Sequence, residues 1–177
     1  MEERTDLELI DKACGGDALS FAALADRHYM TVYRYAFRWC CSREDAEDIT
    51  QEVFIKLTGK IHLFDKRSRF TTWLYRLTAN CAMDFARKNN KWTKYKAAEP
   101  PKNGLIASPN PGPESNVIAK NILKVVDGLP DKQKEAVLLV FAEGMSHKEA
   151  AMVAGCAETT ISWRIFQAKR KLRKVLS

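Results

Sequence analysis

The sequence lacks the cysteine spacing by which disulfides or zinc sites stabilise a small domain. Its five cysteines are odd in number, and no two of them stand in a Cys-x-x-Cys spacing. A disulfide framework or a structural zinc site normally shows such pairing, so we expect reduced, mostly buried thiols in a cytoplasmic protein. The alternative is a zinc or redox role for the adjacent pair Cys40 and Cys41. The cysteines are Cys14, Cys40, Cys41, Cys81 and Cys156.

Long apolar runs are also missing. Residues 1–6 are acidic and lack the apolar core of a signal peptide. No stretch approaches the roughly 18 consecutive apolar residues that a membrane span needs. The sequence therefore predicts a protein that is not itself a membrane protein.

The usual marks of an enzyme are absent from the sequence. It contains no Gly-rich phosphate loop and no nucleophile elbow. The three histidines, His28, His62 and His147, are scattered, and none stands at metal-ligand spacing from the clustered acids. We therefore predict no intrinsic catalysis, no cofactor and no metal. The alternative that this argues against is a nuclease acting on bound DNA.

Proline is almost confined to one short segment. Residues 1–95 contain none, whereas five of the six prolines fall within residues 99–113, among glycines, serines and asparagines. Such a stretch does not continue a helix and buries little surface, so it is typical of an extended linker. We predict an N-terminal domain at residues 1–95, a linker at 96–113 and a C-terminal domain at 114–177.

Strand signals are equally scarce, because no segment alternates cleanly between turn pairs. Helical spacing of apolar residues appears on both sides of the linker. The sequence therefore predicts an all-α fold of two small helical domains. The helices are expected near residues 6–14, 18–40, 43–60 and 70–90, and then near 114–127, 131–143, 147–154 and 158–175.

Positive charge is in excess, with 29 Lys and Arg against 22 Asp and Glu and a pI near 9.2. A basic balance suits a polyanion or an anionic membrane surface, and is weak evidence alone. The C-terminal domain adds a pattern. Ser146 and Glu149 form a capping box, and Gly155 supplies a left-handed turn before a second helix. This is the spacing of a helix-turn-helix, whose second helix enters the major groove of DNA.

The second helix divides into two faces. Ile161, Ile165, Ala168 and Leu172 form an apolar stripe. The other side combines polar residues and two aromatic residues with a basic end, which suits base reading and phosphate contact. A merely solvated basic face is the alternative, but it has no use for Trp163 and Phe166. The expected DNA contacts are Glu158, Thr159, Thr160, Ser162, Trp163, Arg164, Phe166, Gln167 and Arg170.

A second basic and aromatic segment lies before the linker. Residues 66–94 hold eight bases and one acid, Asp84. Aromatic and basic residues together suit unstacked single-stranded DNA, and a polar stripe on the helix near 70–90 suits phosphates and base edges. The expected DNA contacts are Phe64, Lys66, Arg67, Arg69, Phe70, Thr72, Arg76, Asn80 and Arg87.

The preceding helix carries the opposite charge. Residues 43–52 hold five acids and one base. Ala46, Ile49, Val53 and Leu57 form its expected buried side. The acids face outward, where they suit a basic protein surface better than DNA. A solvated helix face is the alternative.

These segments resemble those of bacterial sigma factors. DAEDITQEVFIK, residues 45–56, resembles the polymerase-binding segment, and FTTWLYRLTAN, residues 70–80, resembles the segment that melts and reads the minus-ten element. LPD at 129–131 with GMSHKEAA at 144–151 resembles the start of the fourth domain, and TISWRIFQAK at 160–169 its recognition helix. The order and spacing are the family's. Two domains joined only by a linker are the mark of the extracytoplasmic-function group.

The resemblance implies a region 2-like helical bundle, a region 4-like helix-turn-helix and a division of labour. Core polymerase would be bound through its beta-prime coiled coil and beta flap, with Glu47, Asp48, Gln51, Glu52 and Ile55 on the docking surface. Residues 64–71 would hold a base flipped from the minus-ten element, and the recognition helix would read the minus-thirty-five element. The linker would thread toward the active centre of the polymerase, and a cognate anti-sigma factor would hold the protein inactive.

Two departures from the family pattern fall on the presumed reading surface. Glu158-Thr159-Thr160 stands where a Gly usually precedes the Thr, and Trp163 stands where a small Ser is common. The promoter sequence therefore does not carry over from better-known members. A helix-turn-helix repressor that binds duplex operator by itself is the alternative function, but it leaves the acidic helix and the basic aromatic loop unexplained.

Overall fold

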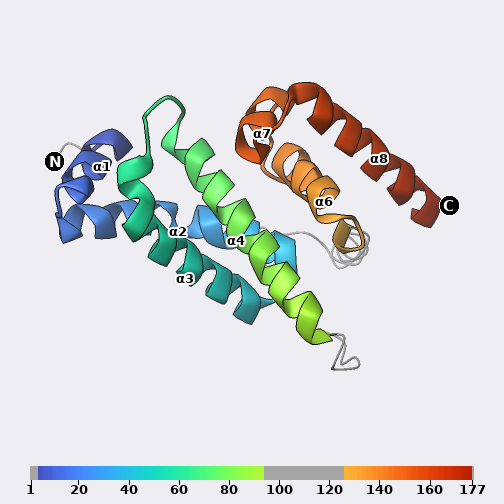
Figure 1. The fold of residues 1–177 in the computed structure, drawn as a ribbon, viewed down its shortest axis with the longest axis horizontal. Coiled ribbons are helices and arrows are strands. Elements are labelled where there is room, and N and C mark those ends of the chain that lie inside the picture. Colours follow the sequence, from blue (N-terminus) through green and yellow to red (C-terminus); the bar gives the residue numbers. More distant parts are fainter. Residues whose placement is uncertain (1–3, 94–125, 177) are drawn as a thin grey trace, which may run out of the picture.

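The structure is a computed structural model that describes residues 4–93 and 126–176, without the side chains of 90–93 and 174–176. Within these ranges the regular elements are all helical. They form two groups, α1 to α4 and α6 to α8, and the second group packs against α4 (Figure 1). The predicted linker at 96–113 and most of the predicted helix at 114–127 lie outside the described residues.

The N-terminal group begins with α1 (Asp6–Cys14), α2 (Ala18–Cys40) and α3 (Arg43–Lys60). Each starts where a side chain accepts a hydrogen bond from a free backbone N–H: Thr5, Asp17 and Ser42 are the N-caps. A short 3-10 turn, η1 (Ile61–Leu63), and a loop lead into α4 (Phe70–Thr93). The predicted bounds of the first three helices are confirmed, and α4 extends past residue 90.

The core of this group lies between α2, α3 and α4. Trp39, Tyr35 and Leu74 are among its largest fully buried side chains. The predicted apolar side of α3 is confirmed, because Ala46, Ile49, Val53 and Leu57 are at most 1% exposed. Burying this stripe turns the acidic face of α3 toward solvent.

The C-terminal group contains α6 (Asp131–Val137), a wider π-helical turn η2 (Leu138–Ala142), α7 (His147–Ala154) and α8 (Glu158–Leu176). The predicted capping box of α7 forms, with Glu149 N–H donating to Ser146 Oγ at 3.2 Å. Gly155 ends α7 at a φ of 62°, a left-handed conformation that glycine adopts without strain. Ile161, Ile165 and Ala168 pack α8 into the core. The helix-turn-helix therefore forms as predicted.

The five cysteines are free, and the prediction that they are mostly buried is wrong. Only Cys81 is buried, whereas Cys14 is exposed because the short helix α1 ends there. Burial raises the pKa of the Cys40 thiol to about 11. Cys40 is therefore protonated at neutral pH, which disfavours thiolate chemistry at the Cys40 and Cys41 pair.

No helix within residues 4–93 and 126–176 is both long enough and apolar enough to cross a membrane. In the same ranges, no three or more His, Cys, Asp or Glu side chains gather where they could hold a metal ion.

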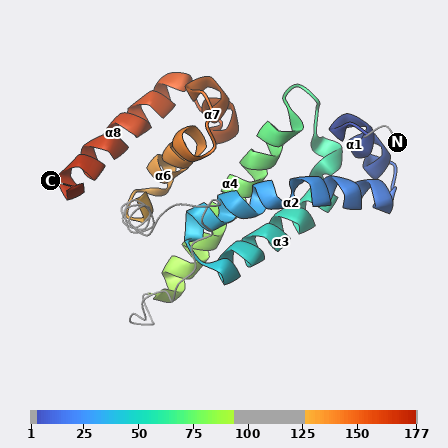
Figure 2. The same cartoon turned by 180° about the vertical axis from the view of Figure 1, so that it is seen from behind.

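The two groups of helices touch mainly through α4, with a smaller contact between α2 and η2. Helix α7 lies against α4, while α6 and α7 stand between α4 and α8 (Figures 1 and 2). Helix α8 is consequently the outermost helix on its side of the molecule, and much of its length faces solvent.

Candidate nucleic-acid interface

The loop before α4 presents cations outward and aromatic rings inward. Lys66, Arg67 and Arg69 are exposed. Phe64 and Phe70 are 6% and 4% exposed, and their ring centroids lie 5.6 Å apart in an edge-on contact. Phe64 also lies 5.8 Å from the ring of Trp73. The two phenylalanines support the loop from within, and their predicted contact with DNA stays a prediction.

One residue of this loop has an unusual backbone. Lys66 has a φ of 59°, in the left-handed region that a side chain rarely adopts. Its Nζ lies 2.6 Å from a carboxylate oxygen of Asp11 in α1. The contact ties the loop to the N-terminal helix, although both side chains are about half exposed and the pair contributes little energy on its own.

The polar stripe of α4 lies where the sequence places it. Arg76, Asn80 and Arg87 are exposed and Thr72 is half-buried. Met83, which helical spacing puts on the same side, is buried because it packs where α4 meets the C-terminal group. A cavity of about 390 Å³ opens beside this stripe, lined by Arg67, Ser68, Thr72, Trp73, Arg76 and Met152 among others.

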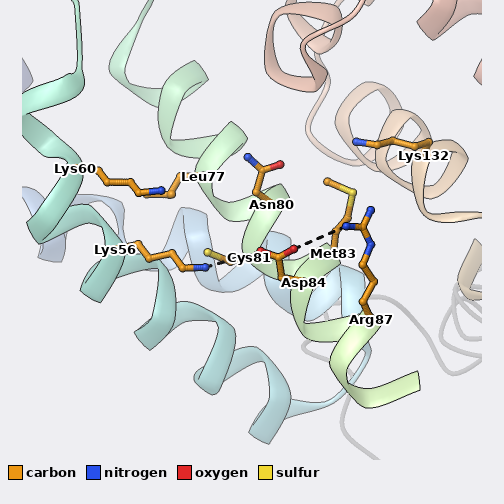
Figure 3. Close-up of a pocket in the computed structure, with 9 residues that line it drawn as sticks. All are labelled: Lys56, Lys60, Leu77, Asn80, Cys81, Met83, Asp84, Arg87 and Lys132. Atoms are coloured by element: carbon orange, nitrogen blue, oxygen red, sulfur yellow. Dashed lines mark ion pairs between the residues drawn. The ribbon is translucent and has the colours of Figure 1, made fainter. Parts of the chain in front are cut away.

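A second cavity, of about 300 Å³, gathers cations from three helices (Figure 3). Lys56 and Lys60 reach it from α3, Arg87 from α4 and Lys132 from α6, while Asp84 is the one acid in its lining. Lys56 Nζ lies 3.2 Å from Glu52 and 4.0 Å from Asp84. Such an excess of positive charge suits a phosphate. Lys56, Lys60 and Lys132 were not expected here from the sequence, because only the packing of three helices brings them together.

The recognition helix α8 exposes most of its expected reading face. Trp163 and Phe166 are 58% and 62% exposed, although both are large aromatic residues. Glu158, Thr159, Ser162 and Arg170 are exposed as well, and Thr160 and Gln167 are half-buried. Exposed aromatic residues on a polar face are typical of a surface that binds something.

Two contacts on α8 could not be seen in the sequence. Arg164 has a side chain only 15% exposed and lies 3.7 Å from the carboxylate of Glu135, which is 2% exposed. His147, at the start of α7, shares a hydrogen bond of 2.9 Å with Ser162 Oγ. Arg164 is therefore engaged inside the domain, and its predicted DNA contact stays a prediction.

The acidic face of α3 is open. The predicted docking residues are all exposed: Glu47, Asp48, Gln51, Glu52 and Ile55. Ile55 is 66% exposed, an apolar side chain on an otherwise polar and mostly acidic face. An acidic surface that also exposes an apolar side chain suits a protein partner, since acids repel the phosphates of DNA.

Arg76 is already engaged in the structure. Its Nε donates to the carbonyl oxygen of Val153 at 3.2 Å, and its Nη2 donates to the carbonyl oxygen of Met152. Both carbonyls belong to the last turn of α7, where helical C=O groups lack partners within the helix. The sequence gives no sign of this pairing, because the two segments lie 76 and 77 residues apart.

Two family models match the chain, and together they span more than half of it. Sigma-70 region 2 matches residues 24–93, and Sigma-70 region 4 matches residues 119–172. The first match contains α3, the loop and α4, and the second contains α6, α7 and nearly all of α8 except its end.

Known proteins are similar along nearly the whole chain. The RNA polymerase sigma factor NccH of Alcaligenes xylosoxydans xylosoxydans is 30% identical, over 97% of this chain and 94% of its own. The ECF RNA polymerase sigma factor SigW of Bacillus subtilis is 31% identical, over 91% of each chain.

Two solved structures have a similar fold. CnrH, in complex with the cytosolic domain of CnrY, superposes with a TM-score of 0.69 at 23% identity, over 97% of this chain and 96% of CnrH. The sigma factor RpoE, in complex with the anti-sigma factor NepR from Bartonella quintana, gives 0.70 at 22% identity, over 88% and 96%. At these identities the likeness concerns the fold alone, and the predicted all-α architecture is confirmed.

Proposed function

Because this chain belongs to the sigma-70 family of RNA polymerase sigma factors, in its extracytoplasmic-function group, we propose a binding partner for each of its exposed surfaces. The exposed acidic face of α3 docks on core RNA polymerase, on the coiled coil of the beta-prime subunit. The loop at 64–70 and the polar stripe of α4 read the minus-ten element. The exposed face of α8 reads the minus-thirty-five element.

The observation that carries this proposal is the separation of charge over one scaffold. The acidic side chains of Glu47, Asp48 and Glu52 are exposed on α3. The basic side chains of Arg67 and Arg69 are exposed on the loop before α4. A single polyanion would not bind both surfaces, because one of them is acidic. Two surfaces of opposite charge fit a protein that docks on a protein partner with one and binds DNA with the other.

The reading surfaces differ in chemistry. On α4 and its loop, Arg67 and Arg76 line a cavity together with the ring of Trp73 and one acid, Asp65. Cations beside an aromatic ring suit a base that has left the duplex. On α8, Ser162, Trp163 and Phe166 stand at the first half of a helix whose second half is basic. That arrangement suits base contacts in a major groove followed by phosphate contacts. The beta flap of the polymerase would hold this domain at the required distance upstream.

We propose further that an anti-sigma factor covers these surfaces until a signal arrives. Two observations support it. The polymerase and DNA surfaces expose Ile55, Trp163 and Phe166, which have no use in the free protein. RpoE of similar fold was solved with an anti-sigma factor bound. The site of action is the cytoplasm, where polymerase and promoter DNA are found.

The docking assignment is tested by reversing one charge. We expect Asp48→Lys to weaken binding to core polymerase at least about tenfold, since a complementary contact becomes a repulsive one. Asp26→Lys is the matched control, because Asp26 is exposed on α2, outside the proposed surface, and changes the net charge equally. Affinity is measured by titration of labelled chain with purified core polymerase. Equal affinities for the two variants, with both folded, would rule out this docking face.

A further inference from the structure

One carboxylate joins the two groups of helices. Glu143 follows η2 in the region 4 segment, and its side chain is 9% exposed. Tyr75 on α4 donates its hydroxyl to one carboxylate oxygen at 2.6 Å, and Arg38 on α2 donates to the other. Burial raises the pKa of Tyr75, and its hydrogen bond to Glu143 raises it further, so the hydroxyl stays a donor. A region 4 anion is thus enclosed by two region 2 donors.

The second contact occupies a residue proposed to read the promoter. The guanidinium of Arg76 binds the carbonyl oxygens of Met152 and Val153 at the end of α7. Met152 also lines the cavity beside Thr72 and Trp73. Helix α7 therefore stands where DNA would approach α4, and the N–H groups that bind its carbonyls are unavailable to DNA.

A third contact lies deeper in the same interface. Lys134 of α6 places its Nζ 5.2 Å from the ring centroid of Trp39, and its side chain is 7% exposed. Its charge is balanced by Asp127 at 2.5 Å. Each of these three contacts between the two segments is polar or charged, a kind of contact that is common where domains move relative to one another.

We propose that Glu143, with Arg38 and Tyr75, is a latch that holds the free protein closed, with α7 of region 4 occupying Arg76 on the minus-ten reading face. The latch rests on the proposed function in one respect, the assignment of α4 to the minus-ten element. Closure and promoter binding compete for Arg76. The apparent affinity for promoter DNA therefore falls by the fraction of molecules that are open. Whatever separates the segments, polymerase above all, frees Arg76 on α4, whereas the reading face of α8 is exposed already.

The latch is tested in the full chain by charge reversal and charge exchange. Glu143→Lys places a cation against Arg38 and opens the latch. Arg38→Glu with Glu143→Lys exchanges the two charges and restores the pair. Asp26→Lys is the control for net charge, because any added positive charge tightens DNA binding without specificity. Tyr75→Phe removes one hydroxyl donor to Glu143 and keeps the ring, so it should open the latch less than Glu143→Lys does.

Two readouts are made on each variant. Small-angle scattering gives the radius of gyration, about 16 Å for a compact chain of this length. Binding of a fluorescent single-stranded minus-ten fragment, without polymerase, gives access to α4. We expect Glu143→Lys to raise the radius by about 2 Å or more. We also expect it to tighten fragment binding about tenfold relative to Asp26→Lys, with Tyr75→Phe smaller in both and the exchanged pair close to the native protein.

The outcomes separate the latch from the proposed function. An unchanged radius in Glu143→Lys, or no recovery in the exchanged pair, overturns the latch. An increased radius without tighter fragment binding also overturns the proposal, because closure would then not mask α4. The proposed function itself fails by a different result, the absence of initiation when the native chain is added to core polymerase.

Discussion

Arg164 has two possible roles, a DNA contact or a buried ion pair within the α6 to α8 group. The sequence predicts that it contacts DNA, whereas the structure places it 3.7 Å from Glu135, with its side chain 15% exposed. We predict that Arg164→Ala lowers the stability of the α6 to α8 group. Of its two ion pairs within residues 4–93 and 126–176, Glu135 would keep the one with Lys132, at 3.1 Å. A buried carboxylate that loses a partner destabilises the fold.

The magnitude follows from two contributions. Leaving a buried charge bare costs about 3–5 kcal/mol. Because Lys132 remains, and because 3.7 Å is too long for a hydrogen bond, the electrostatic loss should be only ~1 kcal/mol. The two buried methylenes that the substitution removes, Cγ and Cδ, add roughly 1.6 kcal/mol at about 0.8 each. The expected loss is therefore about 2.6 kcal/mol, a large fraction of the 5–15 kcal/mol that typically stabilises a domain.

The assay is urea unfolding followed by circular dichroism. With a urea dependence of about 2 kcal/mol per molar, the transition of the α6 to α8 group should shift by roughly 1.3 M. Arg164→Met keeps the stem and should lose ~1 kcal/mol. Arg170→Ala, exposed on the same helix, should change stability by under about 0.5 kcal/mol. If Arg164→Ala matched Arg170→Ala in stability but lost promoter affinity, the buried role would be wrong.

Two further predictions concern other surfaces. Because Trp163 is 58% exposed, Trp163→Ala should change stability by under about 0.5 kcal/mol while it alters the preferred minus-thirty-five element. Selection from a randomised promoter library measures the preference, and uniformly weaker binding with an unchanged preference would contradict the prediction. Burial alone would raise the pKa of Asp6, but Arg27 and His28 outweigh it and lower that pKa. Asp6 therefore stabilises the fold above about pH 4, and this is lost as pH falls through its folded pKa. Unfolding at several pH values should show a weaker acid dependence in Asp6→Asn; an unchanged dependence would contradict it.

Local pattern was enough to predict the helices. The apolar spacing of α3, the capping box at Ser146 and the left-handed turn at Gly155 are all decided by residues within a few positions of each other. The aromatic exposure of Trp163 and Phe166 followed from the same spacing, because the opposite stripe had to pack. These features need no knowledge of tertiary structure.

Contacts between distant segments could not be predicted in this way. The sequence around Arg76 predicts a DNA contact and does not show that its guanidinium binds the end of α7. The residues around Glu143 likewise do not predict its contact with Tyr75. Phe64 was expected at the surface because aromatic residues near cations suit a base. It is buried because Phe70 and Trp73, which come later in the chain, enclose it. The cavity formed by α3, α4 and α6 likewise depends on the packing of three helices.

Transcription in vitro shows directly whether this chain directs RNA polymerase to promoters. Purified core RNA polymerase is presented with a library of promoter fragments, with the native chain, with Asp48→Lys or with no addition. We expect initiation at a defined subset of promoters only when the native chain is present, and much less with Asp48→Lys. No initiation with the native chain, together with tight and sequence-specific binding of the chain alone to duplex DNA, would contradict it.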